Sequence, residues 1–110
     1  MAHEKELLQK LAQCAAACEM CADACLDEDN IKMMVPCIKL DRDCAKICYT
    51  TASLIASHSE NAQELIRVCE EICRKCADEC EQHDHDHCQE CARACRECEM
   101  ACKQYAQIGI

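Results

Sequence analysis

Cysteine is the residue type in this sequence that can do chemistry, and its spacing is regular. The chain has 16 cysteines in 110 residues, and along the chain they fall into four rows with steps of three, four or seven residues. Residues three or four positions apart share one face of an α-helix. The spacing therefore predicts four helices, each with thiols along one side. The rows are Cys14, Cys18, Cys21 and Cys25; Cys37, Cys44 and Cys48; Cys69, Cys73, Cys76 and Cys80; and Cys88, Cys91, Cys95, Cys98 and Cys102.

Each row continues into other, mostly apolar side chains, which identifies its face as the one turned inward. In an up-down bundle these continuations all lie at the same end. We therefore expect an aliphatic plug at that end and sulfur through the rest of the interior. The continuing residues are Leu7, Leu11, Thr51, Ile55, Leu65, Ile66, Tyr105 and Ile108.

Four amphipathic segments carry these rows, and short polar stretches separate them. They run from about residue 3 to 27, 31 to 57, 60 to 82 and 87 to 107. Connections this short place neighbouring helices antiparallel. One glycine, one proline and two aromatic residues give little support for a sheet. The sequence predicts an all-α, antiparallel up-down-up-down four-helix bundle with a cysteine-lined interior, formed by residues 1–110 as a single metal-binding domain.

The connecting stretches also predict how the helices begin. Ser57 to Glu60 has the spacing of a capping box and should open the third segment. Pro36 removes a backbone donor inside the second segment, so we expect a kink or a short separate first turn there. The candidate caps are Asp29 or Asn30 for the second segment and Asp84 or Asp86 for the fourth.

Inward rows of thiols favour binding of soft metal ions. A lone buried cysteine is usually a small core hydrophobe, but a core of thiols and alanines alone would be underpacked. Disulfides between helix neighbours fit poorly, because Cβ atoms about 5–6 Å apart exceed the roughly 3.5–4.5 Å that a disulfide needs. Soft thiolates select Cu(I), zinc or iron–sulfur clusters.

Parallel rows on rigid helices suit two- or three-coordinate Cu(I) better than the other candidates. Zinc uses four converging ligands, and ferredoxin clusters use a C-x-x-C motif that ends in proline, whereas Cys37 follows Pro36 here. We expect multiple Cu(I) ions, with an iron–sulfur redox protein or a zinc buffer as alternatives. About one ion per cysteine would leave a neutral core, which burial favours. No nucleophile is paired with a base, so we expect no enzyme.

The end opposite the plug should form a mouth for metal uptake. Thioether and imidazole groups bind Cu(I) without negative charge, so they can pass an ion inward without trapping it. Core packing of the methionines and a polar capping role for the histidines are the alternatives. The mouth candidates are Met33, Met34, His83 and His87, beside Cys25, Cys37, Cys80 and Cys88.

Asp41 occupies a position in the second row where a cysteine would fit. A carboxylate suits Cu(I) poorly. We therefore expect an ion pair with Arg42 or with a neighbouring helix. The alternative is a weak ligand or a proton acceptor beside the thiols.

The formal net charge of −9 limits the classes of partner. Nucleic acid and anionic membrane surfaces need a basic patch, so we expect neither and favour cations. The first ten residues contain no apolar run of seven or more, and no long apolar segment follows. We therefore expect no signal peptide and no transmembrane helix, and a cytoplasmic protein with reduced thiols.

Taken together, these motifs resemble the copper storage protein family, in its cytosolic branch without an export signal. The resemblance covers the whole chain. It rests on the four cysteine rows, on the run from Cys37 to Cys48 and on the stretch from His83 to Cys88. It implies a four-helix bundle that assembles into homotetramers and stores Cu(I) inside each bundle, and it supports a mouth of methionine and histidine.

Overall fold

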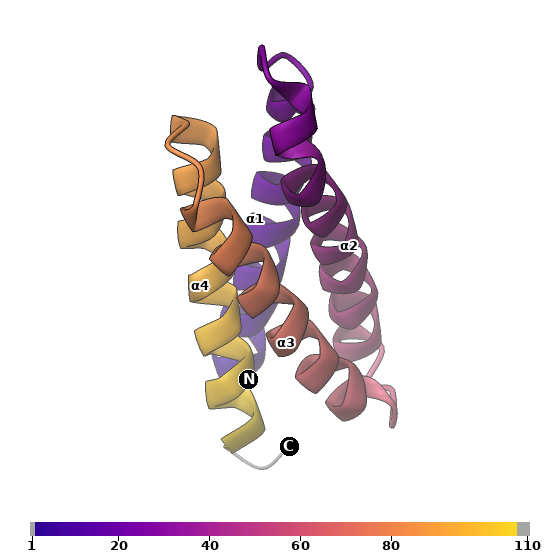
Figure 1. The fold of residues 1–110 in the computed structure, drawn as a ribbon. Helices are drawn as coiled ribbons and strands as arrows, with labels where there is room; N and C mark the ends of the chain where they lie inside the picture. Colours follow the sequence, from indigo (N-terminus) through magenta and orange to yellow (C-terminus); the bar gives the residue numbers. More distant parts are fainter. Residues whose placement is uncertain (1, 108–110) are drawn as a thin grey trace.

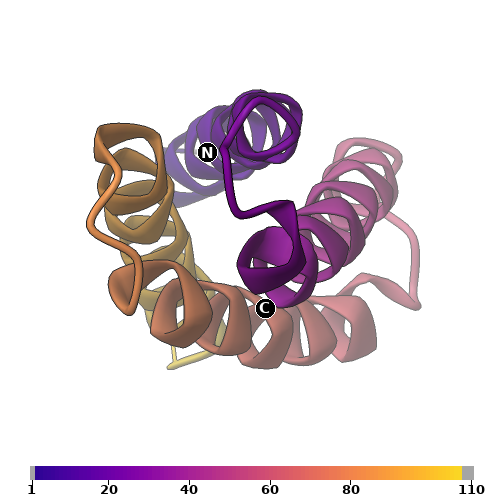
Figure 2. The same cartoon turned by 45° about the horizontal axis from the view of Figure 1, so that its top comes forward.

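Four α-helices account for most of residues 2–107, the part of the chain that the computed structural model describes. Helix α1 spans Ala2–Cys25, α2 spans Ile31–Ala56, α3 spans Ala62–Glu81 and α4 spans Asp86–Gln107. Helix α1 packs against α2 and α4, and α3 packs against the same two helices, so the four surround a common interior (Figure 2). The predicted all-α bundle is confirmed.

The two ends of the bundle carry different connections. Figure 1 shows the α1–α2 turn and the α3–α4 loop at one end, and the α2–α3 connection at the other. The beginning of α1 and the end of α4 lie with the α2–α3 connection (Figure 1). The order along the bundle is therefore up-down-up-down, and all four cysteine rows run along one axis. None of the helices within residues 2–107 combines the length and apolar character needed to cross a bilayer.

Aliphatic side chains close the end that holds the α2–α3 connection, as predicted. Leu7, Leu11, Ile55 and Ile66 are buried there, and Tyr105 lies at the edge of the same cluster. Hydrocarbon in these positions gives this end a core of ordinary composition, and a cavity of about 320 Å³ borders it at Ile55, Ile66 and Tyr105. Thr51, which was also predicted to lie in the plug, is buried, and its hydroxyl donates to the Leu65 carbonyl at 3.4 Å. Leu65 itself is half-buried. Ile108 lies outside the described residues.

Helix α2 ends in a Schellman motif that contains no glycine. Ser57 is the C-cap, and His58 adopts the left-handed conformation with φ 55°. The His58 amide donates to the Ile55 carbonyl at 3.0 Å, and the Ser59 amide donates to the Leu54 carbonyl at 2.9 Å. These two bonds satisfy carbonyls that a helix end otherwise leaves free, which offsets the cost of a positive φ at a residue with a Cβ.

The predicted capping box from Ser57 to Glu60 is therefore wrong. Its first residue belongs to the end of α2, so the chain needs a further turn before α3 can begin at Ala62. In that turn the Ser59 hydroxyl oxygen accepts a hydrogen bond from the Asn61 amide at 3.1 Å. Asn61 is the N-cap of α3, and its side chain makes no capping hydrogen bond.

Helix α2 runs without interruption through Pro36, so the expected separate first turn is wrong. Proline removes a single backbone donor, and the hydrogen bonds on either side can hold the helix together. Asn30, one of the two predicted candidates, is the N-cap of α2. Its side chain makes no capping hydrogen bond to the first turn.

The fourth helix also begins differently from the prediction. Neither Asp84 nor Asp86 precedes α4 as its cap, because Asp86 is already its first residue. The carbonyl of His85 accepts from the amides of Cys88 and Gln89, each at 3.0 Å. The carboxylate of Asp86 still lies in the first turn, where it complements the positive end of the helix.

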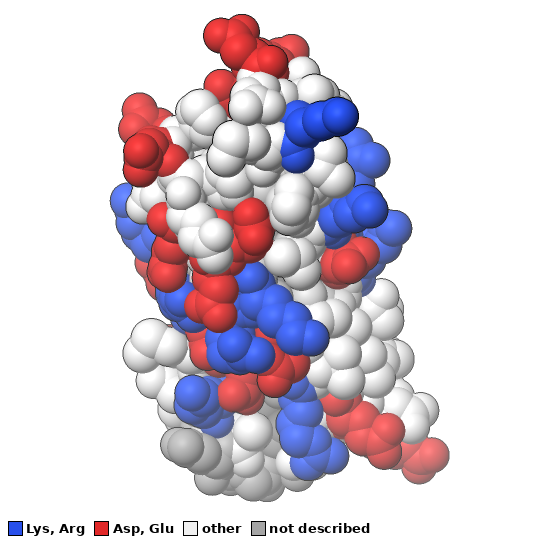
Figure 3. Space-filling model, viewed as in Figure 1, with Lys and Arg blue, Asp and Glu red and all other residues white. Residues whose placement is uncertain are grey.

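Ion pairs hold the outer surfaces of α3 and α4 together. Arg96 on α4 pairs with Asp78 and Glu81 on α3 at 2.5 and 2.8 Å, and with Glu99 on its own helix at 3.2 Å. Figure 3 shows red and blue side chains interleaved over this face. Exposed pairs of this kind each contribute little to stability. Their geometry is consistent with a fixed register between the two helices.

Candidate metal centre

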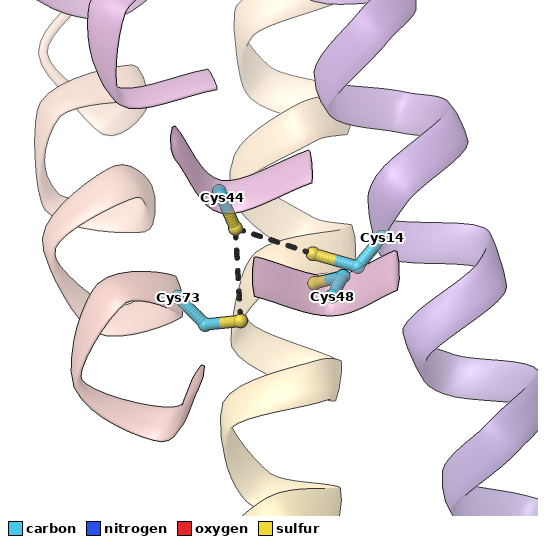
Figure 4. A group of neighbouring side chains, drawn as sticks. All are labelled: Cys14, Cys44, Cys48 and Cys73. Atoms are coloured by element: carbon cyan, nitrogen blue, oxygen red, sulfur yellow. Dashed lines mark hydrogen bonds between the residues drawn. The ribbon is translucent and has the colours of Figure 1, made fainter. Parts of the chain in front are cut away.

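Sulfur atoms from all four helices approach one another along the axis of the bundle. Cys14 Sγ on α1 lies 3.7 Å from Cys44 Sγ on α2 and 3.8 Å from Cys95 Sγ on α4. Cys44 Sγ in turn lies 3.7 Å from Cys73 Sγ on α3 (Figure 4). A metal–thiolate bond of about 2.3 Å places the sulfurs of a three-coordinate ion about 4 Å apart. The helices therefore hold their thiols at spacings that metal ions can bridge.

All sixteen cysteines are buried and free of disulfide bonds. The row positions predicted from the sequence are therefore inward positions, and the structure brings the four rows together. Helix geometry explains the inward rows, and within one helix it also keeps the Cβ atoms of neighbouring cysteines too far apart for a disulfide.

The groups of thiols that could hold an ion overlap. In each group the ligand atoms all lie within 4.8 Å of one another. Cys14 and Cys44 belong to two groups, so an ion in one group would share thiolates with an ion in the next. This arrangement favours a continuous cluster with bridging thiolates over a set of separate sites. Four of the groups are Cys14, Cys44, Cys48 and Cys73; Cys14, Cys18, Cys44 and Cys95; Cys18, Cys76, Cys91 and Cys95; and Cys48, Cys69, Cys73 and Cys98.

Asp41 lies inside this sulfur-lined interior and is fully buried. Cys76 and Cys91 each donate to its Oδ1 at 3.2 Å, and Cys80 donates to the same oxygen at 3.5 Å. Burial, which strips the charged carboxylate of its water, and negative charge at Cys91 and Cys37 together raise the pKa of Asp41 to about 9. Asp41 therefore carries a proton at neutral pH in the metal-free protein.

The ion pair predicted for Asp41 is wrong. Arg42 follows it in the sequence and so lies about 100° further around the helix, where its side chain is exposed. The neighbouring helices present thiols to Asp41 and not basic side chains. The other roles predicted for Asp41 were a weak metal ligand and a proton acceptor beside the thiols. The structure agrees with the second, because thiols surround the carboxyl group and its raised pKa lets it hold a proton.

The thiols at the outer end of the rows differ in acidity. Burial raises the pKa of Cys25 to about 12 and also raises that of Cys88, and negative charge at Cys37 adds to both shifts. The pKa of Cys37 is lowered instead, because hydrogen bonds from Cys21 and Cys80 stabilise its thiolate. An incoming metal ion would displace protons from Cys25 and Cys88, and Cys37 gives up its proton more readily than either.

His87 joins the outermost group of thiols, at the end with the α1–α2 turn. It forms a candidate metal-binding group with Cys21, Cys25 and Cys88. The ring nitrogen Nδ1 lies 3.5 Å from the sulfurs of both Cys21 and Cys88. The half-buried imidazole therefore stands between solvent and the interior thiols, where the mouth was predicted.

The other predicted mouth residues line an adjacent cavity of about 400 Å³. His83, Met33 and Met34 border it, together with the α1–α2 turn and the α3–α4 loop. Met34 is 2% exposed and Met33 is 62% exposed, so one methionine is buried and the other faces solvent. His83 does not reach the thiols as His87 does, and its Nε2 lies 2.7 Å from Glu79 Oε2.

Two carboxylates of the mouth were missed by the sequence analysis. Glu79 lies on α3, four residues before His83, which follows the end of the helix. This spacing in the sequence could have indicated the contact between the two side chains. Glu28 lies 2.8 Å from Nε2 of His87, which is 59 residues away in the sequence. Only the folded structure could bring that pair together.

Asp41→Asn should flatten the pH dependence of stability of the reduced, metal-free protein between about pH 5 and 7.5. An aspartate with a pKa of about 9 when folded and roughly 3.9 when unfolded binds a proton on folding in this range. The free energy of unfolding then falls as pH rises, by up to about 1.4 kcal/mol per pH unit, and asparagine lacks this contribution. Urea unfolding at several pH values measures both slopes.

The matched control is Asp43→Asn on the exposed side of the same helix, which should keep the wild-type slope. Equal slopes for Asp41→Asn and the wild-type protein would show that Asp41 is ionised in the fold.

Comparison with known proteins agrees with this geometry. The model of the copper storage protein family matches residues 1–107. An uncharacterised cysteine-rich protein of Bacillus subtilis (strain 168) is 36% identical over 82 residues, which cover 74% of this chain and 76% of that protein.

Solved structures show the same fold. A Cu(I)-bound copper storage protein, BsCsp3, is 36% identical with a TM-score of 0.91, covering 94% of this chain and 98% of the other. A cytosolic copper storage protein from Streptomyces lividans, solved with five coppers, is 36% identical with a TM-score of 0.93, covering 96% and 93%. The family match spans nearly the whole sequence and coincides with the buried cysteine rows, so the chain belongs to the copper storage protein family.

Proposed function

We propose that this protein stores several Cu(I) ions inside its four-helix bundle, bound by its sixteen interior cysteines. The observation that carries the proposal is the overlap of thiol groups along the axis, in which one sulfur can serve two ions. Support comes from the solved relatives, which include a Cu(I)-bound protein and others loaded with five coppers or ten copper equivalents.

Rigid helices favour Cu(I) over a zinc buffer or an iron–sulfur redox protein. Every thiol is carried by a continuous helix, so the sulfurs have little freedom to move into the regular tetrahedron that zinc prefers or to wrap around a cluster as a ferredoxin loop does. A three-coordinate ion can instead take sulfurs that already lie 3.4 to 4.0 Å apart. Such an ion needs no closed tetrahedron.

Charge neutrality sets the expected capacity. Sixteen thiolates carry sixteen negative charges, which a buried interior tolerates only when cations balance them. One Cu(I) per thiolate brings the sum to zero. Eight ions that each took two unshared thiolates would leave eight uncompensated charges, so bridging thiolates and full loading are favoured.

Anaerobic titration of the reduced apo protein with Cu(I) should end near one equivalent per cysteine, or sixteen per chain. An equal concentration of zinc should not change the end point, because thiolates on rigid helices suit the monovalent ion better. Metal analysis after gel filtration measures both quantities, with protein whose thiols have been alkylated as the control. An end point at or below eight equivalents, or zinc retained in place of copper, would contradict the proposal.

We also propose that copper passes through the mouth of methionine and histidine at the end opposite the plug. The supporting observations are the imidazole of His87 beside two thiols and the cavity that Met33 and Met34 share with His83. Neutral thioether and imidazole ligands bind Cu(I) more weakly than thiolates, so transfer to the interior is downhill.

Replacing the mouth ligands together should slow copper uptake but leave the final capacity unchanged, because the storage thiols remain. Stopped-flow mixing with a Cu(I) complex measures the rate, and titration measures the capacity. The substitutions are Met33→Leu, Met34→Leu, His83→Ala, His85→Ala and His87→Ala.

A matched variant carries the same kinds of substitution away from the mouth and should load like the wild-type protein. It combines Met20→Leu, Met100→Leu, His3→Ala and His58→Ala, all at exposed positions. Unchanged uptake in the mouth variant, or equal slowing in both, would refute this route.

We propose that the protein catalyses no reaction and resides in the cytoplasm. A reducing compartment would keep the sixteen thiols free, and the Streptomyces relative is described as cytosolic. We propose that residues 1–110 act as one domain and that the chain forms a homotetramer, for which exposed Met20, Tyr49 and Met100 offer apolar contacts. The charge of −9 argues against nucleic acid and membrane partners.

A further inference from the structure

His87 is held from both sides of its ring. On the inner side, Nδ1 faces the sulfurs of Cys21 and Cys88 at 3.5 Å. On the outer side, Nε2 lies 2.8 Å from Oε2 of Glu28. The two nitrogens of one imidazole therefore meet different chemistry, with thiols on one side and a carboxylate on the other.

This arrangement selects one tautomer of the neutral ring. An ionised carboxylate can only accept hydrogen bonds, so the proton must reside on Nε2. The lone pair then resides on Nδ1, on the side of the thiols. A metal ion requires that lone pair, so the carboxylate decides which nitrogen can bind it.

Glu28 is itself fixed in the turn between α1 and α2. Its amide donates to the Cys25 carbonyl at 3.2 Å, which ties the turn to the end of α1. The ring of His85 stacks on that of His87 with centroids 5.4 Å apart, and its Nδ1 lies 3.4 Å from the same Glu28 oxygen. The carboxylate therefore has a defined place beside the rings of both histidines.

We propose that Glu28 is a positioning residue for copper uptake, which presents Nδ1 of His87 to an ion arriving at Cys21, Cys25 and Cys88. The inference rests on the proposed storage of Cu(I). It adds Glu28, which lies in the α1–α2 turn, to the residues that take part in copper uptake. By holding the ring and its proton, Glu28 prepares a site of three sulfurs and one nitrogen before the ion arrives. The second carboxylate of the mouth, Glu79, cannot do this, because its partner His83 is not in that group of ligands.

The tautomer of His87 tests this role without any metal. Long-range ¹H–¹⁵N correlation spectra of the reduced apo protein at pH 8 distinguish protonated from unprotonated ring nitrogens. We expect Nε2 to carry the proton in the wild-type protein and the two tautomers to mix in Glu28→Ala. Asp29→Ala, which removes a carboxylate from the same turn, should leave the wild-type tautomer. A wild-type proton on Nδ1, or no change in Glu28→Ala, would overturn the proposal.

Uptake kinetics test whether Glu28 acts through His87. Loss of a group that orients a metal ligand typically costs about tenfold or more, so Glu28→Ala should slow the first phase of Cu(I) uptake by about that factor. In a His87→Ala background the same substitution should have no further effect. Additive slowing, or equal slowing by Asp29→Ala, would show that Glu28 acts only through its charge and would overturn the positioning role.

Capacity separates this proposal from the storage function on which it rests. The final amount of Cu(I) bound by Glu28→Ala should equal that of the wild-type protein, because no storage thiol is changed. If the wild-type protein itself binds few Cu(I) ions, the storage proposal fails. If it fills normally while Glu28→Ala loads at the wild-type rate, only the role of Glu28 fails.

Discussion

The cost of placing charge in a buried interior governs this protein. Sixteen thiols lie where water does not reach them, so each must keep its proton or exchange it for a metal ion. The raised pKa values of Cys25, Cys88 and Asp41 favour the protonated, metal-free state. The spacing of the sulfurs allows the metal-bound state, because neighbouring thiolates can bind the same ion. Filling the bundle is thus an exchange of protons for ions within one fixed framework.

The rest of the fold serves this exchange. Continuous helices keep the thiol rows in register, and the aliphatic residues at one end supply ordinary core packing that does not depend on metal. The other end carries histidine, methionine and carboxylate groups on the α3–α4 loop, the start of α2 and the α1–α2 turn. A net charge of −9 favours the approach of cations to this surface. One end of the bundle therefore contributes to stability, and the other gives metal ions access to the thiols.

The storage interior could be predicted from spacing, because a step of three or four residues fixes the face of a helix whatever its neighbours are. Local features were less secure. The residues from Ser57 to Glu60 have the spacing of a capping box, but Ser57 is instead the C-cap of α2 in a Schellman motif. The sequence predicts an ion pair for Asp41 because a carboxylate suits Cu(I) poorly, whereas in the fold thiols surround it. The contact between Glu28 and His87 joins the α1–α2 turn to the first turn of α4, and no periodicity of the sequence relates these two places.

X-ray absorption at the copper edge, measured anaerobically on the fully loaded protein, reports which atoms surround copper inside the bundle. We expect sulfur to dominate the nearest neighbours of copper, with two or three per ion, and copper to lie close to other copper ions because they share thiolates. Nearest neighbours that are mainly oxygen or nitrogen, or copper ions isolated from one another, would contradict it.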